Sequence, residues 1–433
     1  MTNRELMERD LRCLWHPCTQ MKDHEQLPLI PIRHAEGVWL YDFDGRRYLD
    51  AISSWWVNLF GHGHPRIAEA ISRQTRELEH VLLAGFSHLP AIELAEKLIE
   101  ITPEGLEKVF YADNGSSAVE VALKMSYHAH RNRGEERFLF LSLTNSYHGE
   151  TLGALSIGDV ALYKETYRPL LIRNIQTPVP DGTDPEATAN ALASLEQLLK
   201  ERGPEIAAMI VEPLVQGAGG MQMYAPEYLS GARRLTEQYG IHLIADEIMT
   251  GFGRTGTMFA CEQAGISPDF ICLSKGLTGG FLPLSAVVTT DEIYRLFYGD
   301  YTEYKAFLHS HSYTGNPLAC TAALSTLKIF EEENILERNR EKISRIAKNL
   351  ERFTALDNVT SIRQTGMIAA VEMNNYPPEE RRGLSVYRYG LDHEVLLRPL
   401  GNVIYFMPPY IISDEEIDMM MEVAYRGIRS LES

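Results

Sequence analysis

The sequence predicts an α/β fold in which a large, doubly wound, mainly parallel sheet carries a smaller α+β domain. From residue 108 onward, short apolar runs alternate with segments of helical periodicity, which is typical of repeated βαβ units. Asp246 and Lys275 each follow such a run, where the carboxyl ends of parallel strands open into a crevice. A length of 433 residues, 45% of them hydrophobic and 23% charged, suits one large α/β domain with an accessory domain.

The expected elements follow in chain order. Residues 26–60 alternate in short apolar pieces with turn signals, which indicates a small antiparallel meander, and helical periodicity covers 63–100. The strands expected in the large sheet are 108–112, 138–142, 207–212, 241–246, 270–274 and 285–289. Helical patterns lie between most of them, at 116–132, 190–202, 226–239 and 317–333.

The last hundred residues predict a smaller α+β unit. A helix over 336–355 precedes strands near 359–373 and 396–408, and a last helix starts at Ser413. We expect the N-terminal segment, 1–62, to join 335–433 in one discontinuous small domain. The large domain would then be 63–334.

Composition excludes several classes of partner. The formal charge of −18 argues against nucleic acid and against an anionic membrane surface, since their binders carry basic patches. The chain has five cysteines with wide spacing, which favours reduced thiols. It shows no apolar run of about 18 residues and no signal peptide, so we expect a cytoplasmic protein without a membrane span.

Asp246 and Lys275 are the most informative residues. Each taken alone has an ordinary interpretation, because a strand-end aspartate is often a cap and a lysine in a turn is often solvated. Together at one sheet edge they match the needs of pyridoxal phosphate (PLP). The lysine binds the cofactor covalently, and the acid keeps the pyridine nitrogen protonated.

The segment 111–125 predicts a phosphate site. It is a strand, a Gly/Ser turn and a helix, so Gly115 allows close backbone approach and Ser116 offers a hydroxyl at a positive helix end. The alternative is that Asn114 or Ser116 is simply an N-cap. Both interpretations can hold at once.

Three further motifs have competing interpretations. GFGRTG over 251–256 spells a dinucleotide pattern, but it does not join a strand directly to a long helix, so a mobile or close-packed loop is favoured. His62 and His64 lack further ligands, which favours a turn entering a helix and predicts no metal site. Arg398 lies among apolar residues and needs an anion, either a substrate carboxylate or an internal acid such as Glu212.

Taken together these residues resemble the class III, or ω-amino, PLP-dependent aminotransferases over nearly the whole chain. The general motifs are NGSSAVEVALK (114–124), SYHGET (146–151), VEPLVQGAGGM (211–221), LIADEIMTGFGRTG (243–256), LSKGLTGG (273–280) and TGNPLAC (314–320). A narrower likeness is to the members that aminate 8-amino-7-oxononanoate in biotin synthesis. It is carried by LWHPCTQMK (14–22), SSWW (53–56), HSHSYTGNPLAC (309–320) and LRPLGNVIYFMPPYII (397–412).

The resemblance implies PLP transferase fold type I, a homodimer and a set of cofactor contacts. Lys275 would bind PLP and then move protons, Asp246 would pair with the pyridine nitrogen, and Tyr147 would pack on the ring and contact substrate. The phosphate would be held by Gly115 and Ser116, and from the neighbouring subunit by His311 and Ser312.

The resemblance also implies a substrate site. Trp55 and Trp56 would wall the apolar chain of the oxononanoate, Arg398 would take its carboxylate, and Tyr405 would line the same pocket. The physical fit is good, because a long apolar chain that ends in a carboxylate needs an aromatic trough and a distal arginine. Cys18 and Ser310 would also face substrate.

Three departures from the family pattern bear on the amino donor. Cys18 replaces a common aromatic residue, Glu150 replaces a common aspartate, and Ser310-His311 replaces a Gly-Pro pair of some members. S-adenosylmethionine is the expected donor, and lysine is the alternative. Another ω-aminotransferase activity and a PLP-binding regulator also remain, although the residues before the large domain show no basic DNA-binding pattern.

Overall fold

The computed structural model describes residues 1–27, 29–374 and 376–432. A seven-stranded sheet forms the centre, in the order β4-β12-β11-β10-β7-β5-β6. Its strands run parallel except for β12, which is antiparallel to β11 and β4. Their bounds are β4 Leu106–Ala112, β5 Leu139–Leu143, β6 Asn174–Thr177, β7 Ile206–Val211, β10 His242–Asp246, β11 Phe270–Leu273 and β12 Ser285–Thr290.

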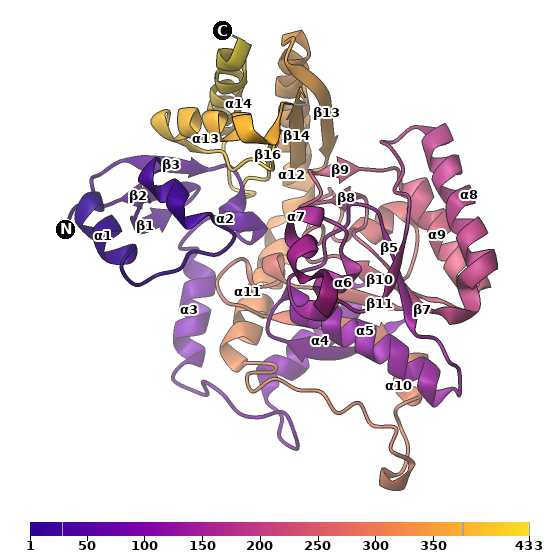
Figure 1. The fold of residues 1–433 in the computed structure, drawn as a ribbon. Helices are drawn as coiled ribbons and strands as arrows, with labels where there is room; N and C mark the ends of the chain where they lie inside the picture. The colour runs from indigo at the N-terminus through magenta and orange to yellow at the C-terminus, as the bar shows by residue number, and fades with distance from the viewer. Residues whose placement is uncertain (28, 375, 433) are drawn as a thin grey trace.

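Alternation along the strands makes two apolar layers, because successive side chains of a strand point to opposite faces. In β11, Ile271 and Leu273 join the larger buried cluster, whereas Phe270 and Cys272 join the smaller one. Helix α5 covers the face of the smaller cluster, and α8 and α9 lie on the other side of the sheet (Figure 1). The sheet is therefore wound on both faces, as predicted.

Several of the longer helices begin at residues whose side chains cap them. Asn114 accepts a hydrogen bond from the Ser117 N–H at the start of α5, and Asp184 and Asn316 cap α8 and α11 in the same way. The longer helices are α1 Asn3–Asp10, α3 Pro65–Gln74, α4 Leu89–Ile101, α5 Gly115–Asn132, α8 Pro185–Arg202, α9 Pro226–Gln238, α11 Pro317–Glu333, α12 Ile335–Leu350, α13 Arg382–Asp392 and α14 Asp414–Arg429.

Two smaller sheets lie outside the large one, and the first of them joins the two ends of the chain (Figure 1). The first has the order β1-β2-β3-β15, and its parallel pair sets Val395 opposite Leu49. The second has the order β13-β14-β16. The pairing of β3 with β15 supports the proposal of a discontinuous small domain. The bounds are β1 Ile32–Glu36, β2 Trp39–Asp42, β3 Arg47–Asp50, β13 Val359–Thr365, β14 Ile368–Met373, β15 Val395–Leu396 and β16 Val403–Phe406.

The structure corrects two expectations and adds elements. The strand meander expected over 26–60 does not reach the double tryptophan, because Ser53–Trp56 forms a single helical turn, α2, with φ between 45° and 76°. The helical stretch 63–100 is interrupted between α3 and α4, where His88 caps α4. Edge strand β6 and helices α1 and α13 were not predicted. Shorter elements are α6 Leu152–Ile157, α7 Ala161–Lys164, α10 Asp291–Arg295, β8 Val215–Gln216, β9 Gln222–Met223 and the 3-10 turn η5 Lys275–Thr278.

Within the described ranges, every helix is too short or too polar to cross a membrane.

Candidate active site

A cavity of about 210 Å³ opens at the carboxyl ends of β10 and β11. It collects residues that are far apart in the sequence, and most of those predicted to bind the cofactor line it. The lining residues are Trp56, Asn114, Gly115, Ser116, Tyr147, His148, Gly149, Glu212, Val215, Asp246, Ile248, Met249, Thr250 and Lys275. We call Gly115, Ser116, Asp246 and Lys275 the floor of the cavity.

Lys275 has an amine prepared for nucleophilic chemistry. It follows β11 with φ 45°, so the backbone turns sharply at this residue. Burial lowers the pKa of Lys275 to about 8, although Asp246 and Glu212 act in the opposite direction. Its Nζ lies 4.5 Å from the centroid of the Trp56 ring and has no hydrogen-bond partner within the described residues. A larger share of this lysine is therefore an uncharged nucleophile near neutral pH than is usual.

Asp246 is held in place by a buried histidine. The Nδ1 of His148 lies 2.8 Å from one carboxylate oxygen of Asp246, and both side chains are almost fully buried. The other oxygen accepts from the Ile248 N–H at 3.2 Å. An ionised carboxylate only accepts hydrogen bonds, so Nδ1 of His148 must be the donor. The carboxylate retains acceptor capacity for one more cationic N–H.

The start of α5 forms the predicted anion seat. Asn114 caps the Ser117 N–H at 3.1 Å, whereas the N–H groups of Gly115 and Ser116 have no acceptor in the described part of the chain. Ser116 Oγ accepts from the Glu150 N–H at 3.1 Å. A Cβ on Gly149 would lie 2.0 Å from that hydroxyl oxygen, so only glycine fits there. The cap and the seat therefore coexist, because they use different N–H groups.

Glu212 fixes the loop that carries Tyr147. Its two carboxylate oxygens accept from the backbone N–H groups of Tyr147 and Gly217, each at 2.8 Å. Burial raises the pKa of Glu212 to about 7. The Tyr147 hydroxyl donates to Glu150 at 3.2 Å. Glu212 is therefore not the anion that Arg398 requires.

A second group of residues, which we call the wall, consists of the turn Ser53–Trp56 with Tyr405 and Arg398, and it meets the cavity at Trp56. The turn is left-handed, a conformation that costs about 1–2 kcal/mol per residue with a side chain. Asp50 compensates, because its carboxylate accepts from the Ser54 N–H at 2.9 Å and from the Ser54 hydroxyl at 2.7 Å. The Ser53 hydroxyl donates to the Met407 carbonyl at 2.7 Å.

Arg254 of the GFGRTG segment supports the wall from behind. It is 1% exposed, and it donates to the carbonyl oxygens of Asn58 at 2.9 Å, Pro408 at 2.9 Å and Trp56 at 3.4 Å. The segment is thus a close-packed loop, which was the favoured interpretation. Its arginine holds the residues that follow the left-handed turn.

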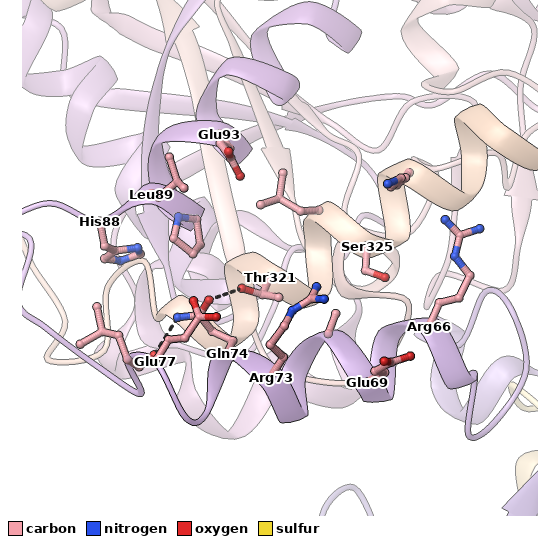
Figure 2. Close-up of a pocket in the computed structure, with 15 residues that line it drawn as sticks. Arg66, Glu69, Arg73, Gln74, Glu77, His88, Leu89, Glu93, Thr321 and Ser325 are labelled. Atoms are coloured by element: carbon pink, nitrogen blue, oxygen red, sulfur yellow. Dashed lines mark hydrogen bonds between the residues drawn. The ribbon is translucent and has the colours of Figure 1, made fainter.

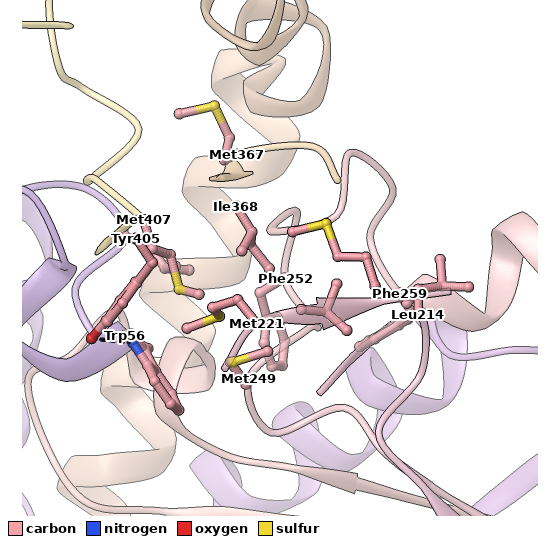
Figure 3. Packing of buried hydrophobic residues seen from close by; sticks show 14 of the residues in the cluster. Trp56, Leu214, Met221, Met249, Phe252, Phe259, Met367, Ile368, Tyr405 and Met407 are labelled. Atoms are coloured by element: carbon pink, nitrogen blue, oxygen red, sulfur yellow. Dashed lines mark hydrogen bonds between the residues drawn. The ribbon is translucent and has the colours of Figure 1, made fainter. Parts of the chain in front are cut away.

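Trp56 and Tyr405 form the inner part of the wall. The Trp56 indole N–H donates to the Tyr405 hydroxyl at 3.0 Å, and the two rings pack edge to face. Figure 3 shows the pair at the edge of a buried cluster that contains Met221, Met249 and Met407. Methionine adapts its shape readily, so the packing behind the wall can adjust to it.

Trp55 and Arg398 form the outer part of the wall. Trp55 is 40% exposed, and the Arg398 guanidinium lies 4.8 Å from its ring centroid. No carboxylate within the described residues pairs with Arg398. Cys18 lies beside the Tyr163 hydroxyl, and burial together with this thiol raises the pKa of Tyr163 to about 12. The structure thus brings Cys18 near Tyr147, whose ring packs against Tyr163.

Seven predicted residues are not among those that line this cavity. Four of them are Cys18 and the wall residues Trp55, Arg398 and Tyr405, which are described above. Ser310, His311 and Ser312 lie on the loop before α11, where both serines are exposed. His311 instead contacts Asp113, with 3.3 Å between Nδ1 and Oδ2. Their assignment to a neighbouring subunit's site stays a prediction.

A larger hollow lies away from this chemistry. It measures about 670 Å³ and runs between α3, α4 and α11, with Arg66, Glu69 and Arg73 along α3 and Glu93 on α4 (Figure 2). Nothing there resembles a nucleophile beside a buried acid. Size is therefore a poor guide to the site in this chain.

Sequence reasoning missed the residues that support the site. From the sequence, His148 is only an aromatic residue that could stack on a cofactor, and neither Asp50 nor Arg254 has a predicted role. The signal for Arg254 was present, since a charged residue within a Gly/Phe-rich apolar segment requires buried acceptors.

His62 contacts Asp50 at 2.9 Å, and His64 precedes α3, which confirms the turn entering a helix. No group of three or more His, Cys, Asp or Glu side chains that could hold a metal ion occurs among residues 1–27, 29–374 and 376–432.

Comparisons with known proteins identify one family that matches nearly the whole chain. A family model described as aminotransferase class-III matches residues 19–426. An adenosylmethionine-8-amino-7-oxononanoate aminotransferase of Helicobacter pylori is 54% identical over 94% of this chain and 94% of its own. The protein of the same name from Aquifex aeolicus is 44% identical over 98% of this chain and 97% of its own.

Solved structures show the same arrangement. The crystal structure of the aminotransferase of that name from Methanocaldococcus jannaschii has a TM-score of 0.95 at 39% identity, covering 99% of both chains. A thermostable omega transaminase engineered for the synthesis of bulky amines has a TM-score of 0.93 at 29% identity, again over 99% of both chains. The fold-type prediction is confirmed by these matches.

Proposed function

Since this chain belongs to the class III aminotransferases, a family of PLP-dependent transaminases, we propose that it transfers an amino group from S-adenosylmethionine to 8-amino-7-oxononanoate, giving 7,8-diaminononanoate in biotin synthesis. The observation that carries this proposal is the meeting of Lys275 with the Asp246–His148 pair in one cavity, next to a wall in which Arg398 has no carboxylate partner among the described residues. The names and high identities of the relatives support the substrates.

The floor fits PLP. The free N–H groups of Gly115 and Ser116 suit a phosphate at the start of α5, and the Asp246 carboxylate has capacity for a pyridinium N–H. Lys275 is the amine that would bind the aldehyde, because it is uncharged more often than an ordinary lysine. When bound, PLP supplies an electron-withdrawing ring that can hold the amino group between donor and acceptor.

Two residues of the floor do the proton chemistry. Lys275, once its amine is free, acts first as the base and then as the acid of a 1,3-proton shift. It removes a proton from one carbon and adds a proton to the other. The Asp246 carboxylate would accept from the ring N–H and so favour the protonated ring nitrogen, while His148 keeps the carboxylate oriented. The loop of Tyr147, fixed through Glu212, places an aromatic ring against the cofactor and substrate.

The wall selects the acceptor. A long apolar chain would pack against Trp55 and Trp56, and its terminal carboxylate would pair with Arg398. Tyr405 acts by holding the indole of Trp56. Cys18, near Tyr163 and Tyr147, is positioned to contact the donor.

We infer a homodimer with the site at the subunit interface. The loop before α11 extends from the body of the subunit (Figure 1), and its large apolar side chains are exposed, with Leu308 at 91% and Tyr313 at 63%. Such a loop needs a partner surface. Ser310, His311 and Ser312 would reach the neighbouring subunit's phosphate site from it.

The half-reaction with donor alone tests the proposal. The visible absorption band of the protein with PLP is recorded before and after S-adenosylmethionine is added, with lysine as the competing donor and Lys275→Ala as the control protein. Loss of the band with S-adenosylmethionine is expected. If the band is lost with lysine but not with S-adenosylmethionine, lysine is the donor. If the band persists with both amines, the proposed substrate pair is contradicted.

A further inference from the structure

Four side chains form a continuous row along the loop before α11. Lys124 Nζ of α5 lies 2.9 Å from His309 Nδ1, and His309 Nε2 lies 3.0 Å from His311 Nε2. His311 Nδ1 then lies 3.3 Å from Asp113 Oδ2, at the end of β4. The row joins the loop that carries Ser310 and Ser312 to the turn that leads into the phosphate seat of its own subunit.

Only one arrangement of hydrogens satisfies all three contacts. A lysine ammonium only donates, so His309 Nδ1 must accept and its ring hydrogen must be on Nε2. His311 Nε2 must then accept, and its hydrogen must be on Nδ1, which faces the Asp113 carboxylate at 3.3 Å. Both imidazoles are therefore neutral, and each has a defined tautomer.

An additional proton on either His309 or His311 breaks the row. If His309 gained one, its Nδ1–H would point at the Lys124 ammonium. If His311 gained one, its Nε2–H would meet the Nε2–H of His309 unless His309 moved its hydrogen to Nδ1, which again opposes Lys124. The lysine is thus the group that forbids protonation, whereas the Asp113 carboxylate favours it.

The other groups around the two rings do not change this outcome. Phe307 stacks on His309 and Phe110 packs nearby, and neither carries a charge. Glu120 of α5 attracts a proton toward His309, but its Oε1 accepts from the Thr151 hydroxyl and two backbone N–H groups. Thr314 accepts from the His311 backbone N–H and leaves the ring free.

We infer that His309 and His311 are positioning residues, and that the row from Lys124 to Asp113 holds the loop in place only while both imidazoles are neutral. The consequence for catalysis rests on the proposed dimer, in which this loop completes the neighbouring site. Loss of the row in acid would then release Ser310, His311 and Ser312 together.

Acid is expected to weaken the row, because the row requires both imidazoles to be neutral. Burial, followed by Lys124, holds the pKa of His309 below its ordinary value. A histidine with a lowered pKa in the folded state contributes its full stability above the unfolded value of about 6.5, and loses it as the pH falls below that value. We therefore expect an ordered loop at pH 8 and a loosened loop near pH 5.5.

Hydrogen exchange of the cofactor-free protein tests the inference directly. Mass spectrometry follows the peptide over 304–316 from pH 8 to pH 5.5, with exchange times scaled to the intrinsic rate at each pH and light scattering to verify constant mass. In the wild type we expect protection of this peptide to fall about two- to tenfold, the effect of one or two hydrogen bonds. A peptide from β5 serves as the internal standard.

Lys124→Met gives the decisive comparison. Without the ammonium, His311 can take a proton while His309 donates from Nδ1 to water, so the contacts between the rings and to Asp113 survive. This variant is expected to lose the acid-dependent step, whereas Lys124→Arg keeps it. His128→Gln is the matched control, because its ring packs near Phe307 without a hydrogen bond to any described residue.

Equal acid loss in Lys124→Met and the wild type would overturn the inference, and so would a wild-type loop with no acid-dependent step. His309→Phe should show low protection at both pH values. These readouts need neither PLP nor substrate, so their failure is distinct from failure of the proposed aminotransferase activity.

Discussion

The floor and the wall of the cavity are built from different kinds of structure. The floor consists of strand ends and a capped helix, with Asp246 at the end of β10, Lys275 after β11 and the seat at the start of α5. The wall depends on a left-handed turn at Ser53–Trp56, which needs Asp50 and Arg254 to hold it.

This difference assigns the chemical steps to the floor and the recognition of the substrate to the wall. Strand ends and helix starts present backbone groups and charges in a fixed geometry, which suits chemistry that every aminotransferase shares. A strained turn is tolerated only where surrounding contacts determine it, and such turns concentrate at functional sites. We therefore expect changes in the floor to abolish turnover, and changes in the wall to alter which substrate is used.

Lys275→Ala should have the largest effect. It removes the nucleophile and the proton carrier together, so turnover should fall by at least about a thousandfold while PLP still binds without a covalent bond. Steady-state kinetics and cofactor content of the purified variant measure this. Lys328→Ala, in the larger hollow, is the control and should keep full activity. Repeated turnover in Lys275→Ala would contradict the assignment of the floor.

Asp246→Asn should come next. The amide cannot stabilise a pyridinium N–H, so the rate should fall about 10²- to 10⁴-fold with PLP content close to that of the wild type. Single-turnover absorbance with excess donor measures the step. A rate near that of the wild type would show that the His148–Asp246 pair is only structural.

Arg398→Ala should separate the two half-reactions. Losing a hydrogen-bonded ion pair costs about 1.5–3 kcal/mol, so the KM for the oxononanoate should rise roughly 10- to 150-fold. The donor half-reaction should change little, because the donor is expected to lie near Cys18. Separate measurement of both half-reactions decides this, and a defect confined to the donor would reassign Arg398.

Cys18→Ala should have the smallest effect. The thiol is a weak hydrogen-bonding group beside the Tyr163 hydroxyl, so the KM for S-adenosylmethionine should change by less than about tenfold. The KM for the oxononanoate is the internal reference. A larger change in donor KM would mean that recognition of the donor depends on this thiol.

The same division explains what the sequence could predict. Asp246, Lys275 and the seat at Gly115 follow from local patterns, since apolar runs and a Gly/Ser turn define where strands end and a helix begins. The left-handed turn could not be predicted, because serine and tryptophan do not favour positive φ and its support comes from Asp50 and Arg254 through tertiary contacts.

Two other features were out of reach for related reasons. Edge strand β6 is short and mostly half-buried, so it lacks the continuous apolar run of the central strands. The loop with His309 and His311 is ordered by Lys124 and Asp113, which are distant in sequence. Its proposed place in a neighbouring site depends on a second subunit.

Chemical location of the cofactor tests the central claim most directly. The protein is incubated with PLP, reduced with borohydride to fix the cofactor on its lysine, and digested for mass spectrometry, with and without prior addition of S-adenosylmethionine. We predict the label on Lys275 alone, and its loss when the donor is added first. A label on another lysine, or a Lys275 label that the donor does not remove, would contradict the account.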